Sequence, residues 1–254
     1  MNKDDAVALV KGPLGEEFRR FSASCAVPFF WGDPNGQDAE IENGSAFFLR
    51  WDNRAFVVTA DHVYESYLQR RLISERVVCQ LGTNLTIDPV DRLIDRRGRD
   101  PNNPSEPDKS EPDIATFLVT DEEIERSGKF AFTMPAFQPT PSKGVFFAGF
   151  PASARKKVRH AAYDLGIMSG LVVATSVSDR DISCHFDREC MIEAPEPPTR
   201  MGGMSGAFLA ANVERSGLHF WQPAGVMYEF HDGFEIVKAC RLDNNLLPDG
   251  RIRR

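Results

Sequence analysis

The chain has 254 residues, 42% of them hydrophobic, so it can build a substantial core in one large domain or in two modules of about 100–150 residues. Its formal net charge of −7 argues against a general nucleic-acid-binding protein, which would carry a basic excess to neutralise phosphates. The sequence starts with acidic residues where a secretory signal needs a basic patch. No apolar run approaches the roughly 18 residues of a membrane-spanning helix, so we expect a cytoplasmic protein without a membrane partner.

The five cysteines indicate neither a disulfide framework nor a metal site. Their number is odd, and no two of them form a C-x-x-C pair. A free cysteine in a protein interior behaves as a small apolar side chain. We therefore expect buried free thiols and no metal or other cofactor.

The first 23 residues are predicted to form an N-terminal extension that is partly helical. Apolar side chains recur at near-helical spacing over residues 6–21, and Gly12-Pro13 interrupts the pattern. One or two short helices are expected there.

From residue 24 onward the sequence changes to short runs of β-branched and aromatic residues separated by turn residues. The predicted strands are 24–31, 44–51, 54–60, 75–81, 113–120, 143–150, 169–177, 206–212, 219–230 and 233–241. The Asp-Gly pair at 232–233 favours a two-residue hairpin turn. Strands at this spacing, with few helical patterns between them, are typical of sandwiches and barrels.

Four segments are predicted to lie outside the strands. Residues 96–112 have no apolar side chain, so we expect a long exposed loop, either a plain insertion or a partner-docking segment. Residues 193–200 are rich in proline, which predicts a rigid loop, and the composition of 121–142 suggests a linker between two β halves. The basic run "RKKVRH" at 155–160 indicates a solvated loop or hairpin tip rather than a phosphate site.

The tripeptide Met-Ser-Gly occurs twice, at Ser169 and at Ser205. Ser169 runs directly into an apolar strand, so we interpret it as structural. Ser205 follows Gly202-Gly203-Met204 and precedes Gly206. This spacing permits a tight turn in which the N–H groups of Gly203 and Ser205 point the same way and form an anion pocket.

A histidine and an aspartate lie at strand ends upstream of that turn. His62 comes just after the strand 54–60, where one helical turn is expected, and Asp113 opens the strand 113–120. Alone, each has a simpler interpretation, a surface or capping histidine and a turn aspartate. Together with Ser205 they supply the base, the orienting carboxylate and the hydroxyl that acyl transfer needs. The order His, Asp, Ser and the absence of G-x-S-x-G, since residue 207 is Ala, exclude the α/β-hydrolase arrangement.

Six fragments of the sequence span roughly residues 40–240: in chain order, "GSAFFL", "VVTADHV", "DIATFLV", "GFP", "GMSGAF" and "PAGVM". Together they resemble the landmarks of the trypsin/chymotrypsin-like serine peptidases, in particular of their compact bacterial branch. The resemblance implies an all-β fold of two six-stranded antiparallel barrels with the active site in the cleft between them. The barrels would comprise residues 24–130 and 131–245, followed by a C-terminal tail at 246–254.

The resemblance also implies roles for single residues. Ser205 would be the nucleophile, His62 the general base and later the acid, and Asp113 the carboxylate that orients the imidazole. The backbone N–H groups of Gly203 and Ser205 would form the oxyanion hole. The walls of the first specificity pocket would be Thr199, Arg200, Met227, Tyr228 and Glu229.

Substrate choice is only weakly indicated. Thr199 near the pocket base suggests no fixed charge there, whereas Glu229 would favour a basic side chain if it faced inward. A small or apolar residue before the scissile bond is the expectation.

Several positions depart from the pattern of the family. Asp61 stands where relatives carry a small residue, and we expect its side chain to point away from the ring edge that Asp113 uses. Val63 replaces the cysteine of secreted relatives, in keeping with a reducing compartment, and Met204 replaces the aspartate that digestive relatives pair with a freed N-terminus. Ala207 and Phe208 change the packing behind Ser205.

The leading hypothesis is a cytoplasmic serine endopeptidase that cleaves a specific intracellular protein through an acyl-enzyme. It would use a polypeptide substrate, with a protein activator or regulatory partner left open. The alternatives are a catalytically silent binding module of the same fold, an esterase with the same triad, and a purely structural β protein.

Overall fold

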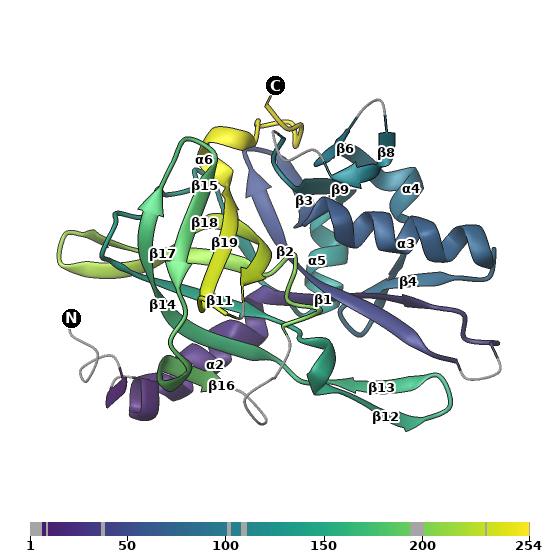
Figure 1. Ribbon diagram of the computed structural model, residues 1–254, viewed down its shortest axis with the longest axis horizontal. Helices are drawn as coiled ribbons and strands as arrows, with labels where there is room; N and C mark the ends of the chain where they lie inside the picture. The colour runs from purple at the N-terminus through teal and green to yellow at the C-terminus, as the bar shows by residue number, and fades with distance from the viewer. Residues whose placement is uncertain are drawn as a thin grey trace.

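The computed structural model describes residues 7–8, 10–36, 39–100, 103–107, 111–193, 201–231 and 233–253. Two β-sheets dominate the structure, with few helices, and they lie side by side in Figure 1. The predicted all-β, chymotrypsin-type two-barrel fold is therefore confirmed. No helix among the described residues is long and apolar enough to cross a membrane.

The first sheet contains eight strands from the N-terminal half. Its order is β5-β4-β1-β2-β3-β9-β6, with β10 beside β2, and all pairs are antiparallel except β10–β2. The strands are β1 Ala26–Gly32, β2 Ile41–Trp51, β3 Arg54–Thr59, β4 Val78–Leu81, β5 Leu85–Ile87, β6 Leu93–Arg97, β9 Ile114–Val119 and β10 Ala131–Thr133. No pairing between described residues joins β5 to β6, so this sheet is curled but open rather than the closed six-stranded barrel expected.

The second sheet closes into a six-stranded barrel. Its order is β11-β17-β18-β19-β15-β14, β11 also pairs with β14 to complete the ring, and β16 lies outside beside β14. The strands are β11 Gly144–Gly149, β14 Met168–Val177, β15 Asp181–His185, β16 Met191–Glu193, β17 Phe208–Arg215, β18 Leu218–His231 and β19 Ile236–Arg241. The predicted boundaries of the two barrels stay a prediction.

An aromatic cluster joins the two sheets. Phe47 from β2 meets Phe208 from β17 with 6.1 Å between ring centroids, and Phe208 packs at 4.9 Å against Phe132 from β10. The helix α2, Pro13–Cys25, adds Phe18 and Phe21 to this cluster. The helix begins at Pro13 because proline is tolerated in the first helical turn, where its missing N–H is not needed. This packing couples the N-terminal segment to both halves (Figure 1).

Two expectations about the first half are wrong. The helix after His62 is not a single turn: α3 runs over Asp61–Ile73. Residues 96–112 are not one long exposed loop, because Arg96 and Arg97 belong to β6 and two short strands, β7 Arg99–Asp100 and β8 Asn103–Pro107, pair with each other. Strand pairing uses backbone groups, so a polar sequence can adopt it.

The segment predicted as a linker contains helix α5, Asp121–Ser127, before β10. Its start is a capping box in which the side chains of Thr120 and Glu123 each accept a hydrogen bond from the other's backbone N–H. The basic run lies in a hairpin of β12, Arg155–Arg159, and β13, Ala162–Leu165, as expected. The remaining short helices are α4 Pro89–Arg92, η1 Ala152–Ala154, η2 Arg188–Cys190 and α6 Leu242–Asn245.

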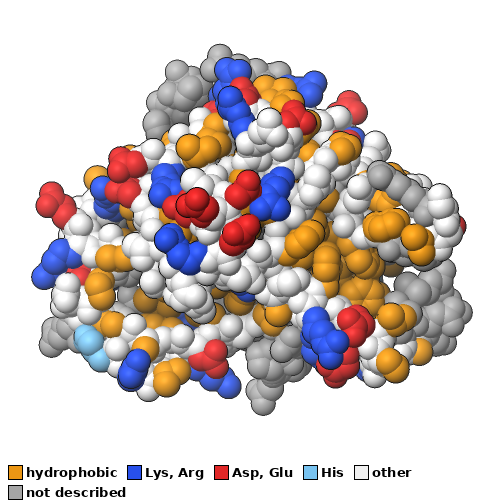
Figure 2. Space-filling model, turned by 180° about the vertical axis from the view of Figure 1, so that it is seen from behind, with side chains coloured by type: hydrophobic (Ala, Val, Ile, Leu, Met, Phe, Trp, Pro, Cys, Tyr) orange, Lys and Arg blue, Asp and Glu red, His pale blue; other side chains and the backbone are white. Residues whose placement is uncertain are grey.

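The C-terminal residues return to the first sheet. Leu246 and Ile252 form a bridge and are buried, and the Ile252 N–H donates to Asp95 of β6 at 3.0 Å. On the face opposite to that of Figure 1, acidic and basic side chains are interspersed around an apolar hollow, with no large region of one charge (Figure 2).

Candidate active site

One carboxylate holds both the backbone and the ring of His62. The His62 N–H donates to Asp113 Oδ1 at 3.0 Å, and the ring Nδ1–H donates to Asp113 Oδ2 at 2.6 Å. This N–H belongs to the first turn of α3, where no carbonyl within the helix can accept it. The bond from Nδ1 therefore orients the His62 ring, and the bond from the backbone N–H holds Asp113 in place beside it.

The sheet pairing explains why these two residues meet. In the antiparallel pair β3–β9, Thr59 lies opposite Ala115, so the residues just after β3 come beside those just before β9. Gly98, between β6 and β7, packs against Asp113. Its φ of +113° suits glycine, and a Cβ there would lie 3.1 Å from the Cα of Asp113.

Asp61 is completely buried and paired with Arg96. The Arg96 Nε and Nη2 donate to the two Asp61 oxygens at 2.6 and 2.9 Å, and Nη2 also donates to Glu65 at 2.8 Å. The guanidinium lies 5.0 Å from the centroid of the Tyr64 ring. These acidic partners hold the pKa of Arg96 above its usual range against the effect of burial. The role of Arg96 was not predicted, although a buried carboxylate such as Asp61 requires a cationic partner.

Two backbone donors in the turn around Ser205 have no acceptor among the described residues. The N–H groups of Met204 and Ala207 donate within the turn, to Met201 O and Met204 O. The Gly206 N–H donates to Met227 O of β18 at 2.7 Å. Within the described residues, the N–H groups of Gly203 and Ser205 donate to nothing. Two unpaired N–H groups in one turn can stabilise a negatively charged oxygen.

Glycine is required at two positions of this turn. Gly203 and Gly206 have φ values of +89° and +87°. A Cβ at Gly206 would lie 1.8 Å from Ser45 O, and one at Gly203 would lie 2.6 Å from the amide nitrogen of Ala152. The close approach of these neighbours fixes the conformation in which the two N–H groups are free.

Ser45 of β2 connects the turn to the first sheet. Its N–H donates to Ser205 O and its hydroxyl donates to Gly203 O, both at 2.8 Å. The same hydroxyl accepts the Phe150 N–H at 2.8 Å. A Cβ at Gly44 would lie 2.5 Å from Val63 and 3.3 Å from Ser205 O, so the segments of His62 and Ser205 flank this glycine. The role of Ser45 was not predicted.

Solvent can reach the His62–Asp113 pair and the Ser205 side chain. The side chains of His62 and Asp113 are 37% and 24% exposed, and Ser205 is partly exposed. Among the described residues no hydrogen bond joins Ser205 Oγ to His62. Such bonds are often long in an unliganded site and shorten in the substrate complex.

The predicted pocket residues are placed only in part. Thr199 and Arg200 lie outside the described residues. Met227 is buried and bonds through its backbone to the Ser205 turn. Burial raises the pKa of the half-buried Tyr228. Glu229 pairs with Lys238 and His231, each at 3.1 Å, so its charge is balanced by neighbouring side chains.

The other sequence features lie away from the site. Ser169 is buried in β14, and its hydroxyl has no hydrogen-bond partner in the described part of the chain. All five cysteines are buried and free, and burial raises the pKa of Cys25 and Cys184 to about 12. The described residues contain no cluster of three or more His, Cys, Asp or Glu that could hold a metal ion.

No protein-family model and no curated protein matches the chain. Among solved structures, an inactivated protease paralogue of the scabies mite is 13% identical with a TM-score of 0.50, covering 88% of this chain and 91% of its own. The chain shares its protease fold. A thermostable serine protease from an extremophilic microorganism is 12% identical with a TM-score of 0.45, covering 86% of this chain and 91% of its own. A protease from M. tuberculosis in its active form is 14% identical with a TM-score of 0.43, covering 93% and 82%.

Proposed function

We propose that the protein is a serine endopeptidase that uses Ser205 as nucleophile, His62 as general base and Asp113 as the orienting carboxylate. The observation that carries this proposal is the double hydrogen bond from His62 to Asp113. The neighbouring turn, with the unpaired N–H groups of Gly203 and Ser205, supports it. A further support is the protease fold.

In the proposed reaction, Ser205 Oγ attacks the carbonyl carbon of the scissile bond while His62 Nε2 takes the hydroxyl proton. Asp113 accepts the Nδ1–H and stabilises the imidazolium. The N–H groups of Gly203 and Ser205 donate to the oxyanion. When the C–N bond breaks, His62 Nε2 gives its proton to the leaving amine. His62 Nε2 then takes a proton from a water molecule, whose oxygen attacks the ester carbon. As the bond between that carbon and Ser205 Oγ breaks, His62 returns the proton to Oγ, which releases the acid product and restores Ser205.

We propose an intracellular polypeptide as substrate and the cytoplasm as location. Five free, buried cysteines support a reducing compartment, since secreted proteins of this size commonly carry disulfides. The balanced charge of Glu229 supports a first specificity pocket without a net negative charge.

Labelling with a fluorophosphonate followed by peptide mass mapping tests the proposal. We expect one adduct, on Ser205, and none in the Ser205→Ala variant. Ser169→Ala is the matched control, because Ser169 is buried and should neither react nor affect labelling. A folded protein that takes up no label would contradict the proposal. Paired amide and ester substrates then separate a peptidase from an esterase.

A catalytically silent binding module is the second candidate. It is favoured by the missing hydrogen bond between Ser205 and His62 among the described residues. The scabies mite protein of similar fold is named as an inactivated protease paralogue. The labelling experiment separates the two candidates, because an unactivated hydroxyl does not react.

A further inference from the structure

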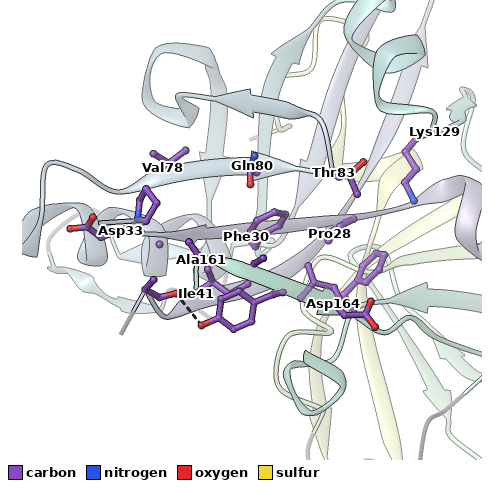
Figure 3. Close-up of a pocket in the computed structure, with 18 residues that line it drawn as sticks. Pro28, Phe30, Asp33, Ile41, Val78, Gln80, Thr83, Lys129, Ala161 and Asp164 are labelled. Atoms are coloured by element: carbon purple, nitrogen blue, oxygen red, sulfur yellow. Dashed lines mark hydrogen bonds between the residues drawn. The ribbon is translucent and has the colours of Figure 1, made fainter. Parts of the chain in front are cut away.

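A groove of about 640 Å³ lies between strands of the first half and the segment 150–165 of the second half. One wall is the outer side of β1 and β4, and the other is the β12–β13 hairpin (Figure 3). Its lining is mainly apolar: Pro28, Phe30, Ile41, Val78, Phe150 and Leu165. Such a surface suits alternate side chains of an extended peptide.

One lining residue of the groove, Phe150, lies beside the Ser205 turn. Asn43, two residues after the lining residue Ile41, donates to Phe150 O at 2.8 Å. A Cβ at Gly203 would lie 2.7 Å from the same carbonyl oxygen. An extended chain advances about 3.3 Å per residue. A polypeptide held at Ser205 would therefore enter the groove within a few residues.

Lys129 supplies a cation without an acidic partner at this groove. Its Nζ donates to Ala23 O at 2.6 Å and lies 6.0 Å from the centroid of the Phe150 ring. In Figure 3 the ammonium points from the rim into the groove. Among the described residues no carboxylate pairs with Lys129, and burial lowers its pKa. A carboxylate bound there would favour the charged ammonium and use its free N–H groups.

Two carboxylates, Asp33 and Asp164, also line the groove. Asp33, just after β1, is already engaged by Ser74 Oγ at 3.0 Å and Arg76 Nε at 3.3 Å. Asp164 lies opposite Lys156 in the hairpin. The hairpin carries the cations Arg155, Lys156, Lys157 and Arg159 on a chain whose net charge is −7.

We propose that this groove binds an extended segment of the polypeptide substrate in which apolar residues alternate with acidic ones, and that one carboxylate pairs with Lys129. This assignment rests on the proposed function and adds a substrate class to it: proteins with an acidic, partly apolar stretch next to the cleaved bond.

Binding is measured in the Ser205→Ala background, so that no peptide is cleaved. The probes are three fluorescein-labelled hexapeptide amides of alternating Val-Glu, Val-Gln and Val-Lys, followed by fluorescence anisotropy. We expect the Glu peptide to bind about tenfold more tightly than the Gln peptide, the effect of one charge-assisted hydrogen bond. The difference should shrink as salt is raised. Equal affinity for all three peptides would overturn the proposal.

Variants of Lys129 locate the effect. Lys129→Met should abolish the preference for Glu, Lys129→Arg should keep it, and Lys129→Glu should favour the Lys peptide. Lys143→Met, which removes an exposed lysine outside the groove, should change nothing. A Lys129→Met protein that still prefers the Glu peptide would contradict the assignment. So would a dimer in which a second copy of the chain fills the groove and which binds the Glu peptide as tightly as the monomer does.

Fluorophosphonate labelling separates this proposal from the proposed function. Labelled Ser205 without a preference for Glu rejects only the groove. Preference for Glu without labelling supports the groove and rejects the peptidase.

Discussion

The buried hydroxyl of Ser45 donates to Gly203 O at 2.8 Å and so connects the first sheet to the turn that carries Ser205. The same oxygen accepts the Phe150 N–H, so one small side chain satisfies groups on two segments of the second half. The positions of the two unpaired N–H groups therefore depend on a residue that would not touch the substrate.

Ser45→Ala should weaken both stability and labelling. The change leaves the Phe150 N–H without its acceptor and Gly203 O without this donor, and we expect a loss of about 1–3 kcal/mol in the free energy of unfolding. Urea denaturation and the fluorophosphonate rate measure the two effects. Ser176→Ala, on an exposed serine of β14, is the control. An unchanged labelling rate would show that Ser45 does not support the turn.

Asp113→Asn should lower peptidase activity by about 10⁴-fold, because an amide cannot stabilise the imidazolium and favours the wrong tautomer of His62. Steady-state assays of kcat/KM, on any peptide that the wild type cleaves, measure this loss. Folding should be preserved, since the Asn side-chain oxygen can still accept the His62 N–H.

Asp61→Asn is the counterpart of that change. It removes the charge that Arg96 neutralises, and we expect a loss of about 2 kcal/mol in unfolding free energy, since Glu65 remains as a partner. Activity per folded molecule should stay within a few-fold of the wild type. If Asp61→Asn abolished activity and Asp113→Asn did not, the assignment of the orienting carboxylate would be wrong.

Gly203→Ala should reduce the labelling rate by about 100-fold, the effect of losing one oxyanion donor. The added Cβ would meet Ala152 N and Phe150 O at a backbone conformation that disfavours alanine. Gly202→Ala is the matched control, because a Cβ there meets nothing within 4 Å. Equal rates for the two variants would remove Gly203 from the proposed oxyanion hole.

Stability at acid pH should depend on Glu123. Burial raises the pKa of its carboxyl, but the hydrogen bonds from Arg92 and from the Thr120 N–H outweigh this and hold the pKa below 4.5. A carboxyl with a lowered folded-state pKa contributes stability above its unfolded pKa and loses it as pH falls through the folded value.

Denaturation of wild type and Glu123→Gln between pH 7 and pH 3 tests this. The variant should be less stable by about 1 kcal/mol at pH 7, and the difference should shrink as pH falls below 4.5. Glu122→Gln, an exposed neighbour in the same helical turn, should follow the wild type. A difference that does not shrink with falling pH would assign the effect to helix packing rather than to charge.

The sequence predicted the features that depend on local pattern. Short runs of β-branched and aromatic residues predicted strands in a sandwich or barrel. The resemblance of six fragments to the serine peptidases then implied two barrels and the roles of His62, Asp113 and Ser205. Gly203 and Gly206 stood out because few residues tolerate a turn with positive φ.

Features that depend on distant partners were not predicted. Arg96 and Ser45 contact residues 35 and 158 positions away, and neither has a local signature. The length of α3 was underestimated, since its polar residues gave no clear helical period. The open first sheet and the groove depend on how whole strands are arranged in space. Local sequence patterns do not specify that arrangement.

The helix α2 has a consequence for how the molecule is synthesised. Phe18 and Phe21 pack on Trp221 and Phe208, which the ribosome adds roughly two hundred residues later. During translation part of the aromatic face of α2 stays uncovered until residues 208–221 have been added. That uncovered surface is where chaperones would act on the nascent protein.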